Sequence, residues 1–459
     1  MIRITSFTNK SIAVFGLGKT GISSSRALLD AKANVLAWDD SVEARSHAKS
    51  EGLKLTDLYQ VEWNNIDTIL LSPGIPDQFP KPHPLVERAK RSGCEIICDI
   101  ELLARETLKP RIIGITGTNG KSTTTALIGH IFSQSNKKYQ IGGNFGIPAL
   151  DLETLDQSGT YILELSSYQL ERVPSLLLDL AILMNISPDH LDRHNGMEGY
   201  INAKRNILNC LKPNSKAIIG MDDGFCRAIC LEHMVKMGGD NIIPVSIKNR
   251  VPGGVYVDDG RLFDDIENNA KVVLDLRDVT ILRGTHNWQN IAFAYAASKM
   301  WGISEQDTLA AIKSFSGLEH RQNFVRKLGS IEFINDSKAT NIEAAARALE
   351  ANSKILWIAG GRLKENNIDA LLPFLGEVLH VYLIGEAAEA LSNLLDEIVP
   401  TTICNNMDDA VNLAYIAALE KKSATVLLSP ACSSFDQYKN FEERGDAFCS
   451  IVKKLEDRQ

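Results

Sequence analysis

Long apolar runs are missing from this chain of 459 residues. Its most apolar segment, residues 175–186, is interrupted by Asp179 and is far shorter than the roughly 20 apolar residues that span a bilayer. The apolar run Ile12–Phe15 is likewise too short for a secretion signal. We therefore expect a soluble, cytoplasmic protein without membrane insertion.

Zinc-type cysteine spacing and an excess of basic charge are also absent. The eight cysteines are scattered, and the pairs Cys94/Cys98 and Cys226/Cys230 lack the C-x2-C…C-x2-C spacing of a zinc site. We expect reduced thiols rather than a disulfide framework. The net charge of −8 argues against a nucleic-acid-binding surface, although local cations can still hold small anions.

Among the features that are present, a glycine-rich loop, G-T-N-G-K-S-T at residues 117–123, is the most informative. It follows a strand-like apolar run and opens a helix-like one. Backbone N–H groups of such a loop bind phosphates, Lys121 can reach the terminal phosphates, and the Ser122 hydroxyl can bind Mg²⁺. Ile115 stands where the strict Walker A pattern has glycine, and a plain glycine-rich turn is the alternative. We predict triphosphate binding.

The first hundred residues alternate between strand-like and helix-like segments. Strands are predicted at Ser11–Phe15, Asn34–Trp38 and Thr68–Leu71. The glycines of G-L-G-K-T-G at residues 16–21, followed about 20 residues later by Asp39 and Asp40, fit a Rossmann-like unit. By itself, this pattern predicts binding of NAD.

A second block carries the phosphate loop and further strands at residues 161–165 and 181–186. Glu164 stands at the end of the first of these strands. Because ligands of open α/β sheets collect at the carboxyl ends of strands, we expect Glu164 to face the crevice of Lys121 and to hold Mg²⁺. An exposed acid at a strand end is the alternative.

Two histidines follow the second of these strands. We expect His190 and its neighbour Asp189 to project into the same crevice. His190 and His194 are four residues apart, but Leu191 replaces the glutamate of the metalloprotease helix, so a zinc helix is rejected. Farther along, Lys204 lies in an amphipathic helix, where a solvated lysine is the default interpretation.

The rest of the chain continues the α/β pattern. Residues 255–263 predict a hairpin around an Asp-Gly turn, residues 291–299 predict an alanine-rich helix, and the amides of residues 284–290 precede that helix. Those amides suit hydrogen bonds to a nucleobase, with helix capping by Asn287 as an equal alternative. A third block has predicted strands at Ile331–Asn335, Ile355–Ala359, Val381–Ile384 and Thr425–Leu428.

Taken together, the motifs resemble the Mur ligase family of bacterial cell-wall synthesis, and within it the branch that adds D-glutamate. The likeness spans all three blocks. It rests on G-L-G-K-T-G, S-P-G, G-T-N-G-K-S-T, G-G-N-F-G, E-L-S-S-Y-Q-L-E, D-H-L-D-R-H, H-N-x-x-N, G-L-E-H-R, N-D-S-K-A-T-N and S-P-A-C-S-S-F-D-Q-Y-K-N-F. The resemblance replaces the NAD interpretation.

This resemblance implies an α/β protein of three domains. They are a Rossmann-like domain for a UDP substrate at residues 1–99, a central ATPase domain at 100–317, and a C-terminal Rossmann-like ligase domain at 318–459. A hinge near Gly317 would let the third domain close on binding. Matching positions for the UDP substrate are Lys19, Thr20, Asp39, Asp40, Ser41, Gly74, Asn144, Ser166 and His190. Asp40 and Ser41 replace a more usual Thr-Arg pair.

The implied reaction uses ATP to join an amine to a carboxylate through an acyl phosphate. ATP would be bound by the loop residues Gly117, Thr118, Asn119, Gly120, Lys121, Ser122 and Thr123, and by Asn287, Asn290, Arg321 and Asp336. Two Mg²⁺ sites are implied, one at Ser122 and Glu164 and one at His190 and Lys204. The implied catalytic residues are Lys121, His190 and Lys204. Lys204 matches the family's carbamylated lysine, a modification that needs a neutral amine and therefore costs about 4.6 kcal/mol at pH 7 before burial offsets it.

The same resemblance implies the amino-acid site and the partners. D-Glutamate would be held by Thr340, Lys364, Ser434, Phe435 and Phe441. The family usually has G-G-D-x-K where this chain has G-G-R-L-K at residues 360–364. The partners are the small molecules UDP-N-acetylmuramoyl-L-alanine and D-glutamate, and a monomer is expected.

Alternatives remain open at this point. A sister ligase would add L-alanine to the sugar or glutamate to folate. A nicotinamide-dependent oxidoreductase would leave the phosphate loop and the third block unexplained. A P-loop switch protein would hydrolyse ATP without any amino acid.

Overall fold

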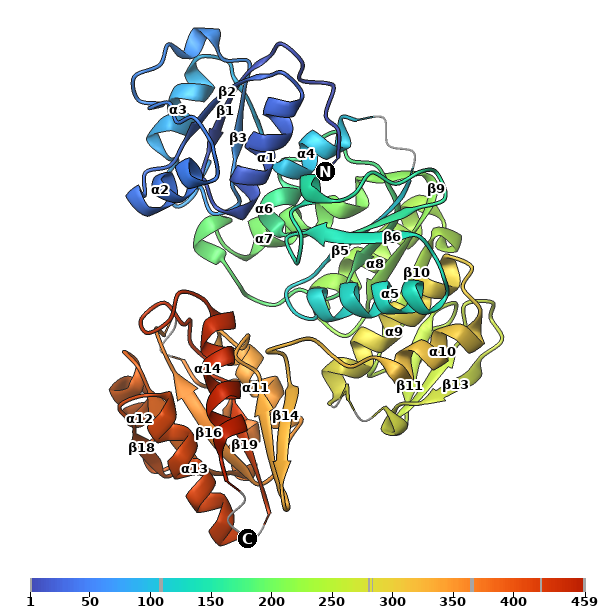
Figure 1. Ribbon diagram of the computed structural model, residues 1–459. Coiled ribbons are helices and arrows are strands. Elements are labelled where there is room, and N and C mark those ends of the chain that lie inside the picture. The colour runs from blue at the N-terminus through green and yellow to red at the C-terminus, as the bar shows by residue number, and fades with distance from the viewer. Residues whose placement is uncertain are drawn as a thin grey trace. The chain divides into compact units, whose positions relative to one another are not determined.

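The computed structural model describes residues 2–106, 110–279, 281–282, 284–363, 367–421 and 423–456. The chain divides into two compact units (Figure 1). The first comprises residues 1–278 and 289–314, and the second comprises residues 279–288 and 315–459. Both are α/β, as predicted.

The first unit begins with a parallel sheet of four strands in the order β2-β1-β3-β4. The strands are β1 Ser11–Phe15, β2 Asn34–Trp38, β3 Thr68–Leu71 and β4 Glu95–Ile97. The accompanying helices are α1 Lys19–Asp30, α2 Val42–Ser50, η1 Trp63–Asn65, α3 Pro84–Arg91 and α4 Asp99–Ala104. The bounds of β1, β2 and β3 confirm the three predicted strands to the residue. Short apolar runs of this kind are typical of strands buried between helices.

The second sheet of this unit has nine strands in the order β13-β12-β11-β10-β9-β8-β5-β7-β6. They are β5 Arg111–Thr116, β6 Tyr139–Gly143, β7 Thr160–Glu164, β8 Leu178–Leu183, β9 Leu211–Gly220, β10 Ile242–Ser246, β11 Val255–Asp258, β12 Arg261–Asp264 and β13 Lys271–Asp275. Strands β11 to β13 pair antiparallel, and the predicted hairpin is β11 and β12. Since β5 lies between β7 and β8, the loops that follow these three strands meet at one edge of the sheet.

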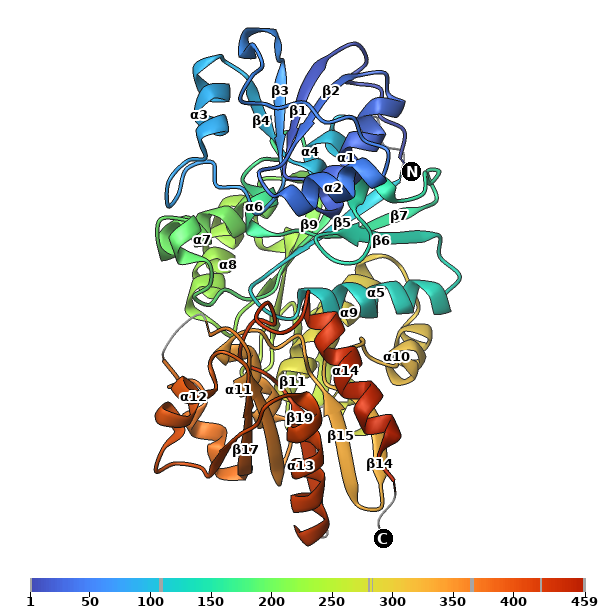
Figure 2. The same ribbon diagram turned by 60° about the vertical axis from the view of Figure 1, so that its left-hand side comes forward.

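The helices of this part of the first unit pack on the nine-stranded sheet or on neighbouring helices, as α10 does on α5 (Figures 1 and 2). They are α5 Lys121–Gln134, η2 Ala149–Asp151, α6 Ser167–Leu170, η3 Leu191–Arg193, α7 Met197–Arg205, η4 Asn206–Leu208, α8 Gly224–Met237, η5 Gly239–Asn241, η6 Leu276–Asp278, α9 Thr285–Met300 and α10 Glu305–Ser314. Helix α9 begins in the second unit and continues into the first. No helix among the described residues has the length and apolar character of a membrane span.

One hydrophobic core joins the two sheets of the first unit. Its buried side chains include Val14 from β1, Leu103 from α4 and Leu163 from β7. The buried Arg172 also forms a 2.9 Å ion pair with Asp77 across the two sheets. Burial raises the pKa of Asp77, but the hydrogen bond and charge of Arg172 outweigh it and leave that pKa below its usual value.

The second unit contains a sheet of six strands in the order β14-β15-β19-β16-β17-β18. The strands are β14 Asn323–Leu328, β15 Ile331–Asn335, β16 Ile355–Gly360, β17 Val378–Ile384, β18 Thr401–Ile403 and β19 Ala424–Leu428, and all neighbours except β14 and β15 pair in parallel. Helices α11 Ile342–Glu350, η7 Leu372–Glu377 and α12 Ala388–Leu395 pack on one face. Helices α13 Met407–Lys421 and α14 Phe441–Lys454 pack on the other (Figure 2).

Candidate active site

The phosphate loop connects the central strand β5 to helix α5 in the first unit. Gly120 caps the helix with φ +85°, a left-handed conformation that favours glycine. A Cβ atom on Gly120 would lie 2.3 Å from Asn290 Oδ1, and one on Gly117 would lie 2.9 Å from Met184 Cβ. Both glycines are therefore required by close packing. Lys121 Nζ donates hydrogen bonds to the carbonyl oxygens of Gly117 and Thr118 at 2.8 and 2.9 Å.

A carboxylate lies directly against this loop. Ser122 Oγ donates a 2.6 Å hydrogen bond to Glu164 Oε2, and Asn144 Nδ2 donates a 2.8 Å bond to Glu164 Oε1. Glu164 is 2% exposed at the end of β7, so the alternative of an exposed acid is wrong. Asn144, expected at the UDP substrate, is thus placed beside the carboxylate that is predicted to hold Mg²⁺. Ser122 and Glu164 supply the hard oxygen ligands that Mg²⁺ prefers.

Lys204 is the second buried charged group at the loop. Its side chain is 2% exposed, its Nζ donates a 2.7 Å hydrogen bond to the carbonyl oxygen of Gly117, and the ring of Tyr200 lies 4.7 Å away. The default of a solvated lysine is therefore wrong. Burial, together with the charge of Lys121, holds the pKa of Lys204 well below its usual value, although Asp189 and Glu164 act in the opposite direction.

Sequence reasoning gave no role to a set of residues that brace the loop. Asn185 Oδ1 accepts a 2.9 Å hydrogen bond from the Asn119 N–H, and Asn185 Nδ2 donates to the Asn119 carbonyl at 3.1 Å. Thr118 Oγ1 and Tyr200 OH are 3.1 Å apart. Asn185 follows β8, which ends at Leu183 rather than at the predicted Ile186. The sequence signal for Asn185 is its place just after β8, a buried strand that pairs with β5, the strand before the phosphate loop.

The two histidines of D-H-L-D-R-H have different surroundings. His194 is buried, and its ring nitrogens contact Glu171 at 2.9 Å and Ser167 at 3.0 Å. His190 is partly exposed, has φ +53°, and its Nε2 lies 3.4 Å from Asp189. Both ring nitrogens of His194 thus have partners in α6 and in the residue that follows it. His190 remains the candidate ligand for a metal ion.

The two predicted amides fall inside helix α9, which begins at Thr285 rather than after Asn290. Asn290 is buried in the first unit and its Oδ1 accepts a 3.3 Å hydrogen bond from Thr124 Oγ1 in helix α5. Asn287 is buried in the part of the helix that belongs to the second unit. Its position in the first helical turn also removes the interpretation of Asn287 as the capping residue.

The predicted UDP residues of the four-stranded sheet surround the end of β1. Lys19 and Thr20 open helix α1. Asp39 accepts hydrogen bonds from the backbone N–H groups of Leu17 at 2.6 Å and Ser41 at 2.8 Å, which ties the glycine loop to β2.

Neighbouring side chains complete this part of the first unit. Asp40 Oδ2 contacts Tyr59 OH at 3.1 Å and His83 Nε2 at 3.0 Å. Gly74 follows β3, and no atom lies within 4 Å of a Cβ added to it. Ser166, also expected at this substrate, caps helix α6 in the nine-stranded part of the unit.

In the second unit, Asp336 follows β15 and is buried. Its carboxylate accepts a 3.1 Å hydrogen bond from the Gln322 N–H and a 3.0 Å bond from Ser429 Oγ. Burial raises the pKa of Asp336 to about 7, although these bonds and the charge of Arg321 lower it. The charge of Arg321 therefore acts on Asp336, and the placement of both residues at ATP stays a prediction.

The predicted D-glutamate residues lie on three segments at the carboxyl edge of the same sheet. Thr340 follows β15, while Ser434 and Phe435 follow β19. Phe441 begins helix α14, and its ring lies 3.9 Å from Lys338 Nζ. Lys364 lies outside the described residues.

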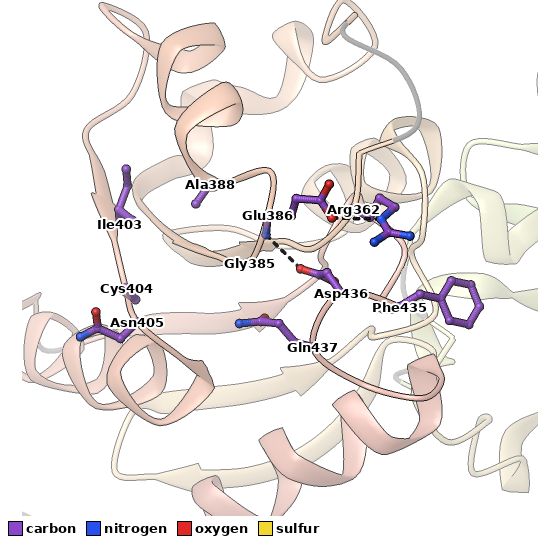
Figure 3. A pocket seen from close by; sticks show the side chains of 10 residues that line it. All are labelled: Arg362, Gly385, Glu386, Ala388, Ile403, Cys404, Asn405, Phe435, Asp436 and Gln437. Atoms are coloured by element: carbon purple, nitrogen blue, oxygen red, sulfur yellow. Dashed lines mark hydrogen bonds and ion pairs between the residues drawn. The ribbon is translucent and has the colours of Figure 1, made fainter.

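A cavity of about 500 Å³ adjoins this edge (Figure 3). Its lining includes Phe435, the 68% exposed aromatic ring, together with Arg362, which pairs with Glu386 at 3.0 Å. The backbone of Arg362 pairs with that of Ser433, so the loops after β16 and β19 meet here. This edge, where loops from neighbouring parallel strands converge, is where open α/β sheets bind ligands.

Comparisons with known proteins give matches both to the part of the chain with the phosphate loop and to the C-terminal part. A family model described as the Mur ligase middle domain matches residues 115–298, and one described as the Mur ligase, glutamate ligase domain matches residues 320–432. The chain is 45% identical over 466 residues to the UDP-N-acetylmuramoylalanine--D-glutamate ligase of Phenylobacterium zucineum, covering 100% of this chain and 99% of that protein. It is 46% identical to the protein of the same name from Caulobacter sp. (strain K31), covering 99% and 98%.

Solved structures agree at the level of the fold. The UDP-N-acetylmuramate-alanine ligase of Thermotoga maritima has a TM-score of 0.60 and 15% identity, covering 97% of this chain and 99% of that one. A pseudomurein peptide ligase type C of Methanothermus fervidus has a TM-score of 0.58 and 18% identity, covering 98% and 100%. The likeness to curated relatives over the whole length of both proteins shows that this chain belongs to the Mur ligase family.

Proposed function

We propose that this chain joins D-glutamate to UDP-N-acetylmuramoyl-L-alanine, with cleavage of ATP, in the synthesis of peptidoglycan precursors. The observation that carries the proposal is the cluster of Ser122, Glu164 and Lys204 at the phosphate loop. The name shared by the full-length relatives directs the proposal to these two substrates.

The first step activates the acceptor carboxylate. A free carboxylate is a poor electrophile, so its oxygen attacks the γ-phosphorus of ATP, the bond to ADP breaks, and an acyl phosphate forms. The residues of the phosphate loop orient the triphosphate, and Lys121 neutralises charge on the transferred group. Such positioning supplies roughly 7–11 kcal/mol of a barrier of this kind.

A magnesium ion fits the pair formed by Ser122 and Glu164, because the two oxygens lie 2.6 Å apart in a buried site beside the phosphate loop. Bound there, Mg²⁺ supplies charge neutralisation at the phosphates. Asn144 holds the second carboxylate oxygen of Glu164, which fixes its orientation. We propose His190 and Lys204 for a second such site.

Carbamylation fits the surroundings of Lys204. The modification converts a cation to an anion, and it starts from the neutral amine. Burial that lowers the pKa of Lys204 increases the neutral fraction. The carbamate would hold metal where the unmodified cation repels it.

The second step forms the amide. The amine of D-glutamate loses a proton, its lone pair attacks the acyl carbon, and phosphate leaves from the tetrahedral intermediate. We propose that Thr340, Lys364, Ser434, Phe435 and Phe441 hold D-glutamate, and that Asn287, Asn290, Arg321 and Asp336 complete the ATP site. The UDP end would lie at Lys19, Thr20, Asp39, Asp40, Ser41 and Gly74. We further propose a monomer working in the cytoplasm.

The test is phosphate release from ATP and Mg²⁺ with UDP-N-acetylmuramoyl-L-alanine, with and without D-glutamate, together with the mass of the amide product. We expect release and product only when both substrates are present, and none with L-glutamate. Release without an acceptor would instead favour an ATPase switch. Turnover with another amino acid in place of D-glutamate would favour a sister ligase.

A further inference from the structure

A buried arginine that the proposed mechanism does not use lies at the start of helix α14. Arg444 is 1% exposed and stands in the first turn of the helix, where Asn440 caps the backbone by accepting a 2.7 Å bond from the Glu443 N–H. Charged side chains are rarely buried to this extent unless they are paired. The partners of Arg444 are therefore informative.

The guanidinium of Arg444 binds oxygens of three segments, which are the loop after β15, the end of β16 and the loop after β19. Its Nη2 donates to the Ser337 carbonyl at 2.8 Å and its Nε to Ser337 Oγ at 3.0 Å. Its Nη1 donates to the carbonyl oxygens of Cys432 at 3.1 Å and Gly360 at 3.4 Å. Ser337 Oγ in turn donates a 2.8 Å bond to the Phe441 carbonyl, which links the loop back to the helix.

Each of these contacts lies close in sequence to a proposed D-glutamate residue. Ser337 precedes Thr340 by three positions, and Cys432 precedes Ser434 by two. Arg444 also contacts Gly360 at the end of β16, and Ser337 links it to Phe441, the first residue of α14. Arg444 thus joins, directly or through Ser337, the segments that bear Thr340, Ser434 and Phe441.

The charge of Arg444 is not neutralised locally. Among the described residues, no carboxylate forms an ion pair with it, and Asp436 acts only as a nearby charge. Burial lowers the pKa of Arg444 to about 10, so the side chain stays a cation at neutral pH. Removal of this side chain would leave the oxygens of Ser337, Cys432 and Gly360 without their donor, so Arg444 is needed to hold these segments together.

We propose that Arg444 is a positioning residue for the amino-acid substrate, one that fixes the loops after β15, β16 and β19 and places positive charge beneath a dianionic ligand. This inference rests on the proposed function. A planar guanidinium can bind several carbonyl oxygens at fixed angles, which a lysine cannot do.

The test compares Arg444→Met and Arg444→Lys with the unchanged chain. We expect Arg444→Met to raise the KM for D-glutamate by about 10- to 100-fold, because small displacements of binding groups have effects of this size. Arg444→Lys keeps the positive charge but loses the planar set of hydrogen-bond donors, so it should raise the KM for D-glutamate by a smaller factor. The KM for ATP should rise less than the KM for D-glutamate, since Arg444 bonds to Ser337 beside Asp336 but the phosphate loop belongs to the other unit.

A half-reaction separates positioning from a general loss of structure. Without D-glutamate, hydroxylamine traps the acyl phosphate formed from ATP and UDP-N-acetylmuramoyl-L-alanine, and we expect Arg444→Met to leave this rate nearly unchanged. The matched control is Arg326→Met, because Arg326 donates to the carbonyl oxygens of Val452, Lys453 and Leu455 at the far end of the same helix. We expect the control to keep its KM for D-glutamate.

The outcomes distinguish the two proposals. An unchanged chain that does not use D-glutamate would overturn the proposed function. If the unchanged chain is active, equal losses in the half-reaction and in D-glutamate use, or no loss at all, would overturn the role of Arg444. If Arg444→Met does not fold, Arg444→Lys and Ser337→Ala take its place, and the half-reaction rate and the KM for D-glutamate are compared for these two variants.

Discussion

At the scale of single residues, burial decides what the charged side chains of this protein can do. Glu164, Lys204 and Asp336 are each at most 7% exposed. A sequence shows that these residues follow strands or lie on helices, but it does not show how completely neighbouring segments cover them. Lys204 is the clearest case, because its pattern favoured a solvated lysine and the packing of α7 against the phosphate loop placed it inside.

The raised pKa of Asp336 predicts a pH dependence of stability. Its folded pKa, about 7, lies above its usual value of 3.8, so the folded state binds the proton more tightly than the unfolded state does. Its contribution to stability is therefore fully present below pH 3.8 and is lost as the pH rises to about 7. We expect the free energy of unfolding of Asp336→Asn, relative to the unchanged chain, to increase across this range by up to about 4 kcal/mol.

Urea unfolding of both proteins between pH 4.5 and 8 measures this difference. Asp369→Asn is the control, because Asp369 is an exposed carboxylate of the same unit. A constant difference between Asp336→Asn and the unchanged chain at every pH would contradict the shifted pKa.

A second prediction concerns Lys204. If its amine is carbamylated, ¹³C-labelled bicarbonate should give a carbamate carbonyl signal that Lys204→Arg lacks, because the guanidinium keeps its proton. We expect Lys204→Arg to lower kcat by about 10- to 100-fold, as for loss of a group that supports a metal. Lys212→Arg, a lysine paired with Asp179 in the same unit, serves as the control. The same signal in both variants would rule out Lys204 as the modified residue.

At the scale of elements, the unit formed by β5, the phosphate loop and α5 shows local sequence and tertiary packing favouring the same structure. The apolar run forms the central strand, the glycines allow the turn, and α5 begins where the loop predicts it. The closest packing comes from Asn290, which is about 170 positions away in the chain and contacts both Gly120 and Thr124. The need for glycine is thus partly local and partly tertiary.

Gly120→Ala tests this tertiary contribution. The added Cβ would lie 2.3 Å from Asn290 Oδ1, so the loop or helix α9 must shift. We expect kcat/KM for ATP to fall by about 100-fold, because displacement of the phosphate cradle misplaces the triphosphate. Gly52→Ala is a matched control, since Gly52 has the same φ of +85° but no atom within 4 Å of the added Cβ. Equal effects of the two substitutions on ATP use would contradict a specific contribution of the contact with Asn290.

At the scale of the whole molecule, the three predicted domains correspond to three sheets, while the compact units number two. The reason lies in the first unit, where α4 and η2 contribute to a core shared by both sheets. The boundary predicted at residue 99 falls at Asp99, the first residue of α4, which is buried against Gln169 at 3.0 Å. The domain ranges and the hinge near Gly317 stay predictions.

The shared core predicts how the chain unfolds. Hydrogen exchange of the full chain at increasing urea should show β1 and β5 opening at the same concentration, because they belong to one hydrophobic core. Strands β16 and β19, which lie in the other unit, should open at a different concentration. Opening of residues 2–98 well before β5 would contradict a single cooperative unit and would support separate folding of the first sheet.

The extent to which sequence sufficed can be seen in particular segments. Strands β1, β2, β3 and β15 match their predictions because each is a short apolar run with polar residues at both ends. The sequence does not predict the start of α9 at Thr285, because polar residues such as Asn287 are typical of a loop. In the structure these residues are helical and Asn287 is buried. Arg444 was missed although it carried a signal, since it stands four and eight positions before the buried Phe448 and Val452 on one helix face.

The phosphate loop, the family resemblance and the strands formed by clear apolar runs follow from the sequence alone, because they depend on local periodicity and on residues close together in the chain. The burial of particular charges, the choice of Asn144 as the amide that holds Glu164, and the joining of segments by Arg444 became evident in the folded chain. Those outcomes depend on contacts between distant segments, where desolvation changes the protonation of a group and fixes its partners.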